Sequence, residues 1–248
     1  MSSCPRLINK RNKMKKSKIN RKGDKAKVEK YKYIYAGPPW RFKNWSMSEL
    51  VTRGEKWARK NGRSPYPVMK TEDIAAMPVS DLAAQDSVLF LWATYPKLKD
   101  GLEVMEGWGF EFKTVAFTWT KLNPSGVGFH FGLGYWTRQN PELVLLGTRG
   151  KPKRVDNTVP NLVIHPRGEH SRKPDEIARR IVKLMGDLPR LELFARRHMA
   201  GWDAWGNEIE CSSEAIQVLG QPAKPIELDV IKPEILSCDF GLFKNGNE

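Results

Sequence analysis

The sequence predicts an α/β protein built on a single doubly wound sheet. Short apolar segments alternate with helix-like segments between residues 31 and 200, an order typical of a sheet with helices on both faces. Most of the apolar segments are continuous rather than alternating, as expected for strands covered on both sides. The length of 248 residues suits one large α/β domain with a substantial core.

Six strands and three helices are predicted in this region. The strands are residues 31–36, 87–94, 113–119, 142–147, 161–165 and 190–195, and the helices are residues 71–76, 96–108 and 174–185. The last helix has the clearest boundaries, because Pro174 suits a first helical turn and Gly186 follows the last one. Its apolar stripe consists of Ile177, Ile181, Leu184 and Met185.

Positive charge is concentrated at the start of the chain. The net charge is +14, to which residues 1–30 contribute +10, residues 31–210 contribute +7 and residues 211–248 contribute −3. A basic arm on a basic body is typical of proteins that bind polyanions, most often nucleic acid. The arm has no aromatic residue, so we expect it to contact phosphates without sequence preference. A solubilising or localising tail is the alternative.

Several classes of protein are disfavoured. No apolar run approaches the roughly 18–20 residues of a membrane span, and no apolar segment follows the basic arm as in a secretory signal. The three cysteines Cys4, Cys211 and Cys238 are too few and too scattered for a disulfide scaffold. We therefore expect a cytoplasmic protein with a disordered arm (residues 1–30), one domain (31–210) and a tail of uncertain order (211–248).

Residues 36–40 read Ala-Gly-Pro-Pro-Trp and directly follow the first predicted strand. Two prolines end a strand abruptly, because neither can donate a backbone hydrogen bond. The rigid turn then lies at the carboxyl end of a strand, where open α/β sheets bind ligands. Trp40 can stack on a planar base, although a plain turn with a buried aromatic residue gives the same pattern.

Residues 126–136 contain two Gly-x-Gly pairs between predicted strands. A dinucleotide-binding loop needs a helix after it, so this interpretation is rejected. A mobile loop that carries aromatic residues over a substrate cleft is more natural, with Arg138 and Glu142 as fixed polar groups behind it.

Two further segments are candidates for ligand binding. Residues 170–176 place basic side chains at a helix N-terminus, which suits a carboxylate or phosphate. Arg196 follows the last predicted strand, and Asn207 and Glu208 on a nearby loop suit the hydroxyl groups of a ribose. The four histidines (His130, His165, His170 and His198) lack metal-ligand spacing, so no metal site is expected.

Together these segments resemble a known family. YAGPPW, YPVMKTEDI, LFLWAT, GWGF, FTWTK, GYWTRQNPELVLLGTRG, EHSRKPDE, ELFAR and GWDAWGNE occur in this order. The set resembles the adenine-N6 methyltransferases typified by the catalytic subunit of the eukaryotic mRNA adenosine methyltransferase. The compact length is similar to that of bacterial and phage members, which methylate DNA. The resemblance covers roughly residues 31–208 and implies a Rossmann-like fold, S-adenosylmethionine as cofactor and DNA, rather than RNA, as partner.

The resemblance also implies roles for individual residues. The turn Gly37, Pro38, Pro39 and Trp40 matches the catalytic motif where the target adenine meets the methyl donor. Tyr66, Trp136, Arg138 and Glu142 match residues that line the substrate site. Lys173 matches the lysine that meets the donor's carboxylate, and Arg196, Asn207 and Glu208 match the group around its ribose.

Gly37 departs from the family, which has Asp at this position. The exocyclic amine of adenine is a poor nucleophile, and a carboxylate there would orient it and stabilise the charge that develops during transfer. Gly keeps the backbone carbonyl but lacks the carboxylate, which predicts a loss of about 10²–10³ in rate. The main hypothesis is a DNA adenine methyltransferase with reduced or lost activity, and the alternatives are a non-catalytic subunit that binds nucleic acid or an RNA adenine methyltransferase.

Overall fold

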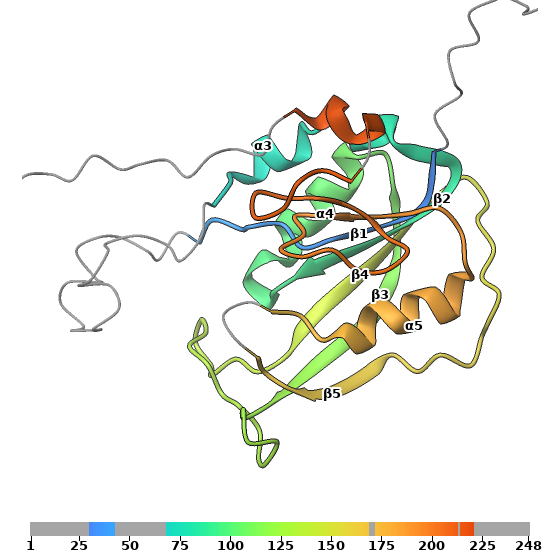
Figure 1. Cartoon of the computed structure of the whole chain (residues 1–248). Helices are drawn as coiled ribbons and strands as arrows, with labels where there is room; N and C mark the ends of the chain where they lie inside the picture. The colour runs from blue at the N-terminus through green and yellow to red at the C-terminus, as the bar shows by residue number, and fades with distance from the viewer. Residues whose placement is uncertain (1–29, 43–67, 169–171, 213, 221–248) are drawn as a thin grey trace, which may run out of the picture.

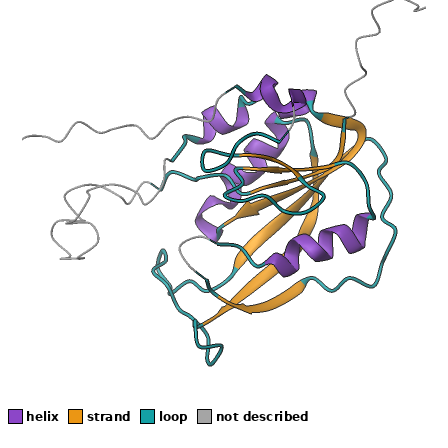
Figure 2. Cartoon of the chain, viewed as in Figure 1, coloured by secondary structure: helices purple, strands orange, loops and turns teal. Residues whose placement is uncertain are grey.

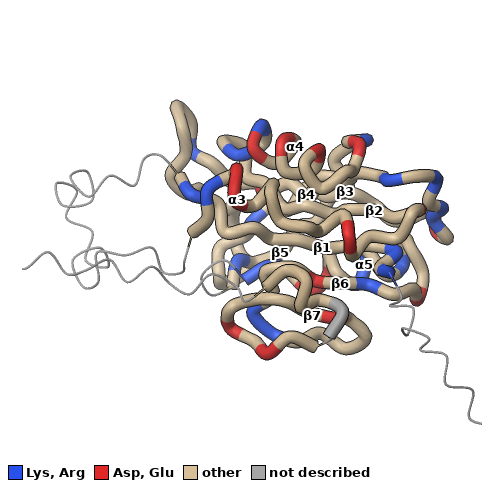
Figure 3. Tube along the Cα trace, turned by 90° about the horizontal axis from the view of Figure 1, so that it is seen from above, with Lys and Arg blue, Asp and Glu red and all other residues tan. Residues whose placement is uncertain are grey.

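The computed structural model describes residues 30–42, 68–168, 172–212 and 214–220 (Figure 1). Tyr66, His170, the basic arm up to residue 29 and the tail from residue 221 lie outside these ranges. In the view of Figure 3, charges of both signs are interspersed over the described chain. The excess of +10 that residues 1–30 contribute lies, except for Lys30, outside the described part of the chain.

Seven strands form one sheet, in the order β5-β3-β4-β2-β1-β6-β7 (Figure 1). Their bounds are β1 Tyr31–Ala36, β2 Ala83–Ala93, β3 Glu111–Leu122, β4 Glu142–Arg149, β5 Leu162–Pro166, β6 Arg190–Leu193 and β7 Asp203–Trp205. All neighbouring strands pair in parallel except where β4 pairs with β2 and β3. The predicted α/β class and Rossmann-like fold are confirmed.

The order of strands reverses next to β1. From β1 the chain first builds outward through β2, and it later returns to the other edge of β1 with β6 and then β7. The main chain registers Tyr35 of β1 with Phe90 of β2 on one side and with Glu192 of β6 on the other. A reversal of this kind leaves a crevice at the carboxyl ends of the strands, where α/β sheets bind ligands.

Helices cover both faces of the sheet (Figure 2). Their bounds are α3 Thr71–Ala75, α4 Leu98–Gly107 and α5 Asp175–Met185, with 3₁₀ turns η1 Val79–Asp81, η2 Tyr95–Lys97 and η3 Glu214–Leu219. Ile74 of α3 and Met105 of α4 lie in one core cluster, and Ile177 of α5 lies in the other. None of the helices in the described part of the chain has the length and apolar character that a membrane crossing requires.

The structure refines several sequence predictions. Tyr31–Ala36 was predicted with the observed bounds, whereas β2 begins earlier than predicted and β3 extends beyond the predicted range at both ends, and each extension includes polar residues. The strand β7 was missed because three residues leave no detectable pattern. The beginning of the predicted tail contains η3, in which Ile216 is fully buried in the core.

Candidate active site

A cavity of about 1000 Å³ lies at the carboxyl ends of β1, β2 and β6, at the point where the strand order reverses. We call it the main cavity. Its floor is aromatic, because Tyr35, Trp92 and Trp119 point from successive strands to the face of the sheet covered by α5. The rings of Trp92 and Trp119 meet edge to face, with centroids 6.1 Å apart. The floor is therefore a firmly packed surface with several polar groups around it.

The turn after β1 forms one wall of the main cavity, and hydrogen bonds hold it on both sides. Gly37 N donates to the carbonyl of Leu193 on β6 at 3.3 Å, and Met69 N donates to the carbonyl of Pro39 at 2.9 Å. The indole Nε1 of Trp40 is buried and donates to the carbonyl of Trp92 at 3.1 Å. Trp40 is consequently part of the turn's anchorage rather than an open stacking surface.

Glu142, the first residue of β4, is held between two lysines in the same cavity. Lys121 Nζ lies 2.6 Å from one carboxylate oxygen, and Lys173 Nζ bonds to the other. Burial acts to raise the pKa of Glu142, but the two ammonium groups outweigh burial and lower this pKa to about 2. Lys173 also lies over the ring of Trp92, with Nζ 4.8 Å from the centroid. The pair thus fixes a lysine ammonium at the edge of the cavity.

The ends of β6 and β7 bring the predicted ribose-binding group together. Arg196 Nε donates to the Glu208 carboxylate at 2.8 Å, and Asn207 lines the same cavity. The loop after β7 lies directly against the end of β6, and this close contact depends on Gly206, because a Cβ at that position would lie 1.9 Å from the carbonyl oxygen of Ala195. Phe194 adopts a left-handed φ of 61° directly after β6, an uncommon conformation for a residue other than glycine. Such strain is often found at functional sites.

The sequence analysis missed Glu192 of β6. Its Oε2 is buried in the main cavity and has no hydrogen-bond partner among the described residues, and the same is true of Thr94 Oγ1. Burial raises the pKa of the Glu192 carboxyl to about 7, an effect that nearby Arg197 opposes and Asp175 adds to. The available signal was a carboxylate between two leucines, Leu191 and Leu193, in a predicted strand. Buried polar atoms without partners are expected where a ligand supplies them.

Most of the predicted site residues within the described ranges lie together in one cavity, and two of them, Trp136 and Arg138, do not. The main cavity is lined by Gly37, Pro38, Pro39, Trp40, Glu142, Lys173, Arg196, Asn207 and Glu208. Trp136 is fully exposed, and Arg138 lines a second cavity beside the main one. Tyr66 lies outside the described residues. Within the described ranges, no group of three or more His, Cys, Asp or Glu side chains could hold a metal ion.

The loop between β3 and β4 projects away from the sheet (Figure 1). It carries exposed aromatic side chains, including Phe129 and Phe131, while His130 lines the main cavity. Asn140 fixes the base of the loop, because its side chain accepts a hydrogen bond from Lys121 N at 2.9 Å and donates to Lys121 O at 2.9 Å. A strand follows this loop rather than a helix, in agreement with rejection of a dinucleotide-binding motif.

Comparison with known proteins relates this arrangement to methyltransferases. Residues 31–208 match the MT-A70 family. The chain is 35% identical over 205 residues to the type II methyltransferase M.MunI of Mycoplasma sp, which covers 78% of this chain and 84% of that protein. It is 30% identical over 175 residues to the N(6)-adenosine-methyltransferase MT-A70-like protein of Arabidopsis thaliana, covering 68% of this chain and 25% of that one. Identity to the human N(6)-adenosine-methyltransferase catalytic subunit METTL3 is 26% over 191 residues, or 75% of this chain and 30% of METTL3.

Proposed function

This chain belongs to the MT-A70 family of methyltransferases, and from that premise we propose that it derives from an adenine-N6 methyltransferase that acts on DNA in the cytoplasm. The observation that carries the proposal is the main cavity, where the turn Gly37–Trp40, the Glu142–Lys173 pair and the Arg196–Glu208 pair converge. DNA is favoured over RNA by the likeness to the compact members of the family. The type II methyltransferase relative is matched over most of its length, whereas the adenosine methyltransferases are matched over about a quarter to a third.

Members of the family use S-adenosylmethionine, which supplies a methyl group on a positively charged sulfur. The residues of the main cavity fit this molecule. Lys173 provides a fixed ammonium for its carboxylate, and Asn207 and Glu208 offer partners for its ribose hydroxyls. Glu192 Oε2 and Thr94 Oγ1 are buried acceptors that have no partner among the described residues, so they suit the donor's ammonium group. Glu192 would then provide the negative charge that Gly37 lacks for binding the donor.

The target amine would meet the chain at the turn after β1. Prolines at two successive positions and the Trp40 hydrogen bond hold the turn rigid, so the Gly37 carbonyl has a fixed direction. A fixed carbonyl can accept one hydrogen bond from the exocyclic amine and orient its lone pair toward the donor. Without a carboxylate beside it, the positive charge that develops on the amine is stabilised less. We therefore expect methyl transfer by this chain to be slow or absent.

The test is methyl transfer from labelled S-adenosylmethionine to unmethylated plasmid DNA by the natural chain and by Gly37→Asp. Among the described residues, a Cβ at Gly37 would meet only Trp92 Cδ1, at 3.7 Å, which is ordinary contact, so the backbone accepts a side chain here without displacing the turn. We expect N6-methyldeoxyadenosine to form about 10²–10³ times faster with the variant. Gly168→Asp is the matched control, because it adds the same carboxylate to the wall of the same cavity at a position away from β1.

The other outcomes point to different conclusions. Equal activity in the natural chain and Gly37→Asp would mean that the carbonyl and positioning suffice. Activity on an RNA transcript of the same plasmid, and not on its DNA, would replace the DNA assignment. If both proteins bind nucleic acid and S-adenosylhomocysteine but methylate neither polymer, the non-catalytic binding subunit becomes the better description.

A further inference from the structure

The second cavity, of about 720 Å³, lies beside the main one, and Phe42 lines both. We call it the side cavity. The two segments that form its walls are next in the chain to residues that line the main cavity. Thr94 is followed by Tyr95 in η2, and the segment 135–141 runs into Glu142. A polymer whose target base enters the main cavity would therefore pass the side cavity with an adjacent residue.

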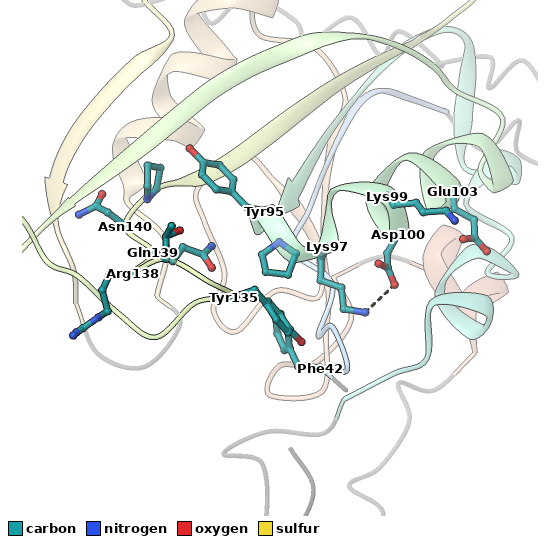
Figure 4. A pocket seen from close by; sticks show the side chains of 13 residues that line it. Phe42, Tyr95, Lys97, Lys99, Asp100, Glu103, Tyr135, Arg138, Gln139 and Asn140 are labelled. Carbon is teal, nitrogen blue, oxygen red and sulfur yellow. Dashed lines mark hydrogen bonds and ion pairs between the residues drawn. The ribbon is translucent and has the colours of Figure 1, made fainter. Parts of the chain in front are cut away.

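The side cavity combines flat aromatic rings with basic groups (Figure 4). Tyr95 and Tyr135 are 50% and 44% exposed, so half of each side chain is available for contact. In Figure 4 the two tyrosine side chains point in different directions from the middle of the cavity, with Arg138 toward one end and Lys99 toward the other. Successive bases of a single strand stack on rings of this kind, while cations beside the rings contact the phosphates.

Two of the basic groups, Lys97 and Arg138, are held in place before any ligand binds. Lys97 Nζ lies 2.8 Å from Asp100 and 5.8 Å from the centre of the Phe42 ring. Arg138 donates from Nε to the carbonyl of Gly132 at 2.9 Å and from Nη2 to the carbonyl of Phe131 at 2.6 Å. Arg138 therefore has a fixed position within its loop, which lowers the entropic cost of using it for binding.

We propose that the side cavity holds the nucleotide next to the target adenine, with its base against Tyr95 and Tyr135 and its phosphate near Lys97, Lys99 and Arg138. This inference rests on the proposed nucleic-acid function and adds to it a subsite for a flanking nucleotide. Asp100 does not oppose a phosphate strongly, because it is already bonded to Lys97 and to the Thr71 hydroxyl. Glu103 is exposed at the far end of the cavity and limits the subsite there.

The experiment measures binding of single-stranded DNA oligonucleotides that contain one adenine, by fluorescence anisotropy, in the presence of S-adenosylhomocysteine. Each oligonucleotide is compared with versions in which the nucleotide on the 5′ or the 3′ side of the adenine is abasic. We expect Tyr95→Ala and Tyr135→Ala to weaken binding of the intact strand about five- to hundredfold. Tyr95→Phe and Tyr135→Phe keep the ring and should bind within about twofold of the natural chain, as stacking requires no hydroxyl.

The decisive comparison combines the abasic strands with the tyrosine substitutions. One of the abasic strands should bind the natural chain more weakly, and that loss should disappear in Tyr95→Ala and Tyr135→Ala. Phe112→Ala is the control, because Phe112 is similarly exposed, at 42%, but lies at the opposite end of β3. If Tyr95→Ala and Tyr135→Ala weaken the binding of intact and of abasic strands by the same factor, this result would overturn the subsite. So would a shift of Tyr95→Ala or Tyr135→Ala toward monomer in sedimentation, since it would assign the side cavity to a second copy of the chain.

Failure of this inference is distinguishable from failure of the proposed function. If Gly37→Asp methylates DNA and the abasic comparison shows no coupling, only the side-cavity subsite is wrong. If the coupling is found and Gly37→Asp methylates nothing, the subsite stands and the catalytic assignment falls.

Discussion

Replacement of Glu192 by Gln tests whether this carboxyl receives the ammonium group of the methyl donor. Only the ionised carboxylate would attract an ammonium, so binding should require Glu192 to lose its proton. With a pKa of about 7, Glu192 is ionised in about half of the molecules at pH 7.0 and in about 3% at pH 5.5. The affinity of the natural chain for S-adenosylhomocysteine should therefore fall about sixteenfold between these pH values. In Glu192→Gln the affinity should be low and nearly constant over the same range.

Isothermal titration calorimetry of both proteins between pH 5.5 and 7.5 measures this difference. The range stays below the pKa of the ligand's own amino group, about 7.7–8.0 for an ordinary α-amine. Arg197 and Asp175 are charged groups that act on the Glu192 carboxyl, and His130 is an ionisable group in the wall of the cavity. A control is therefore needed to assign the pH dependence to Glu192. Glu208→Gln serves as the control, since it should weaken binding without removing the pH dependence. The same pH dependence in the natural chain and in Glu192→Gln would refute the role of Glu192.

Stability gives a second readout for the same substitution. Because burial raises the pKa of Glu192 from 4.5 to about 7, the folded protein holds this proton more tightly than the unfolded chain. The free energy of unfolding of the natural chain should consequently fall as the pH rises from about 4.5 through 7, by up to about 3 kcal/mol. Without ligand, Glu192→Gln should be the more stable protein at pH 8 in urea denaturation. A variant that is less stable at pH 8 would show that Glu192 is satisfied within the fold.

Two further predictions concern the lysine pair and the basic arm. Glu142→Gln leaves Lys121 and Lys173 without their shared carboxylate, so we expect the free energy of unfolding at pH 7 to fall by about 3 kcal/mol in urea denaturation. The pKa of Glu142 is lowered to about 2, so the stability difference between the chain with Glu142 and Glu142→Gln should be complete above about pH 4.5 and disappear as the pH falls through about 2. A stability difference that does not change with pH would argue against ionic stabilisation. Deletion of residues 1–30 should weaken DNA binding and reduce the slope of log K against log[salt] by about 0.9 for each lost phosphate contact. An unchanged slope would exclude phosphate contacts by the arm.

Much of the fold could be predicted because its central strands are continuously apolar. Tyr31–Ala36 is recognisable from composition alone, and α5 has both a first-turn proline and a following glycine. The amino end of β2 was not predicted, since Gln85 and Asp86 are polar and exposed there. The reversed direction of β4 was also hidden, because parallel and antiparallel strands look alike when both faces are covered.

The candidate site divides along similar lines. The turn at Gly37 is a local feature, so its rigidity follows from the two prolines. The contact of Glu142 with Lys173 joins residues 31 positions apart, and only the fold brings them together. The same applies to the side cavity, in which Tyr95 comes from η2 and Tyr135 from the loop between β3 and β4. Trp136 and Arg138 lie outside the main cavity, so their predicted place beside the adenine still awaits a test of substrate binding.

The position of β1 inside the sheet, between β2 and β6, has a consequence for how the chain folds. One edge of β1 pairs with β2, the next strand in the chain, but its other edge pairs with β6, where Arg190 is 157 residues beyond Tyr33. During synthesis the nascent chain therefore exposes an apolar strand edge, a known template for wrong pairing, until most of the domain has been made. Closure of so long a loop is expected to be the slow step of folding. The part of the main cavity formed by Arg196, Asn207 and Glu208 is then the last to form, so a premature stop before β6 leaves a chain with the turn at Gly37 but without the residues that we propose for the donor's ribose.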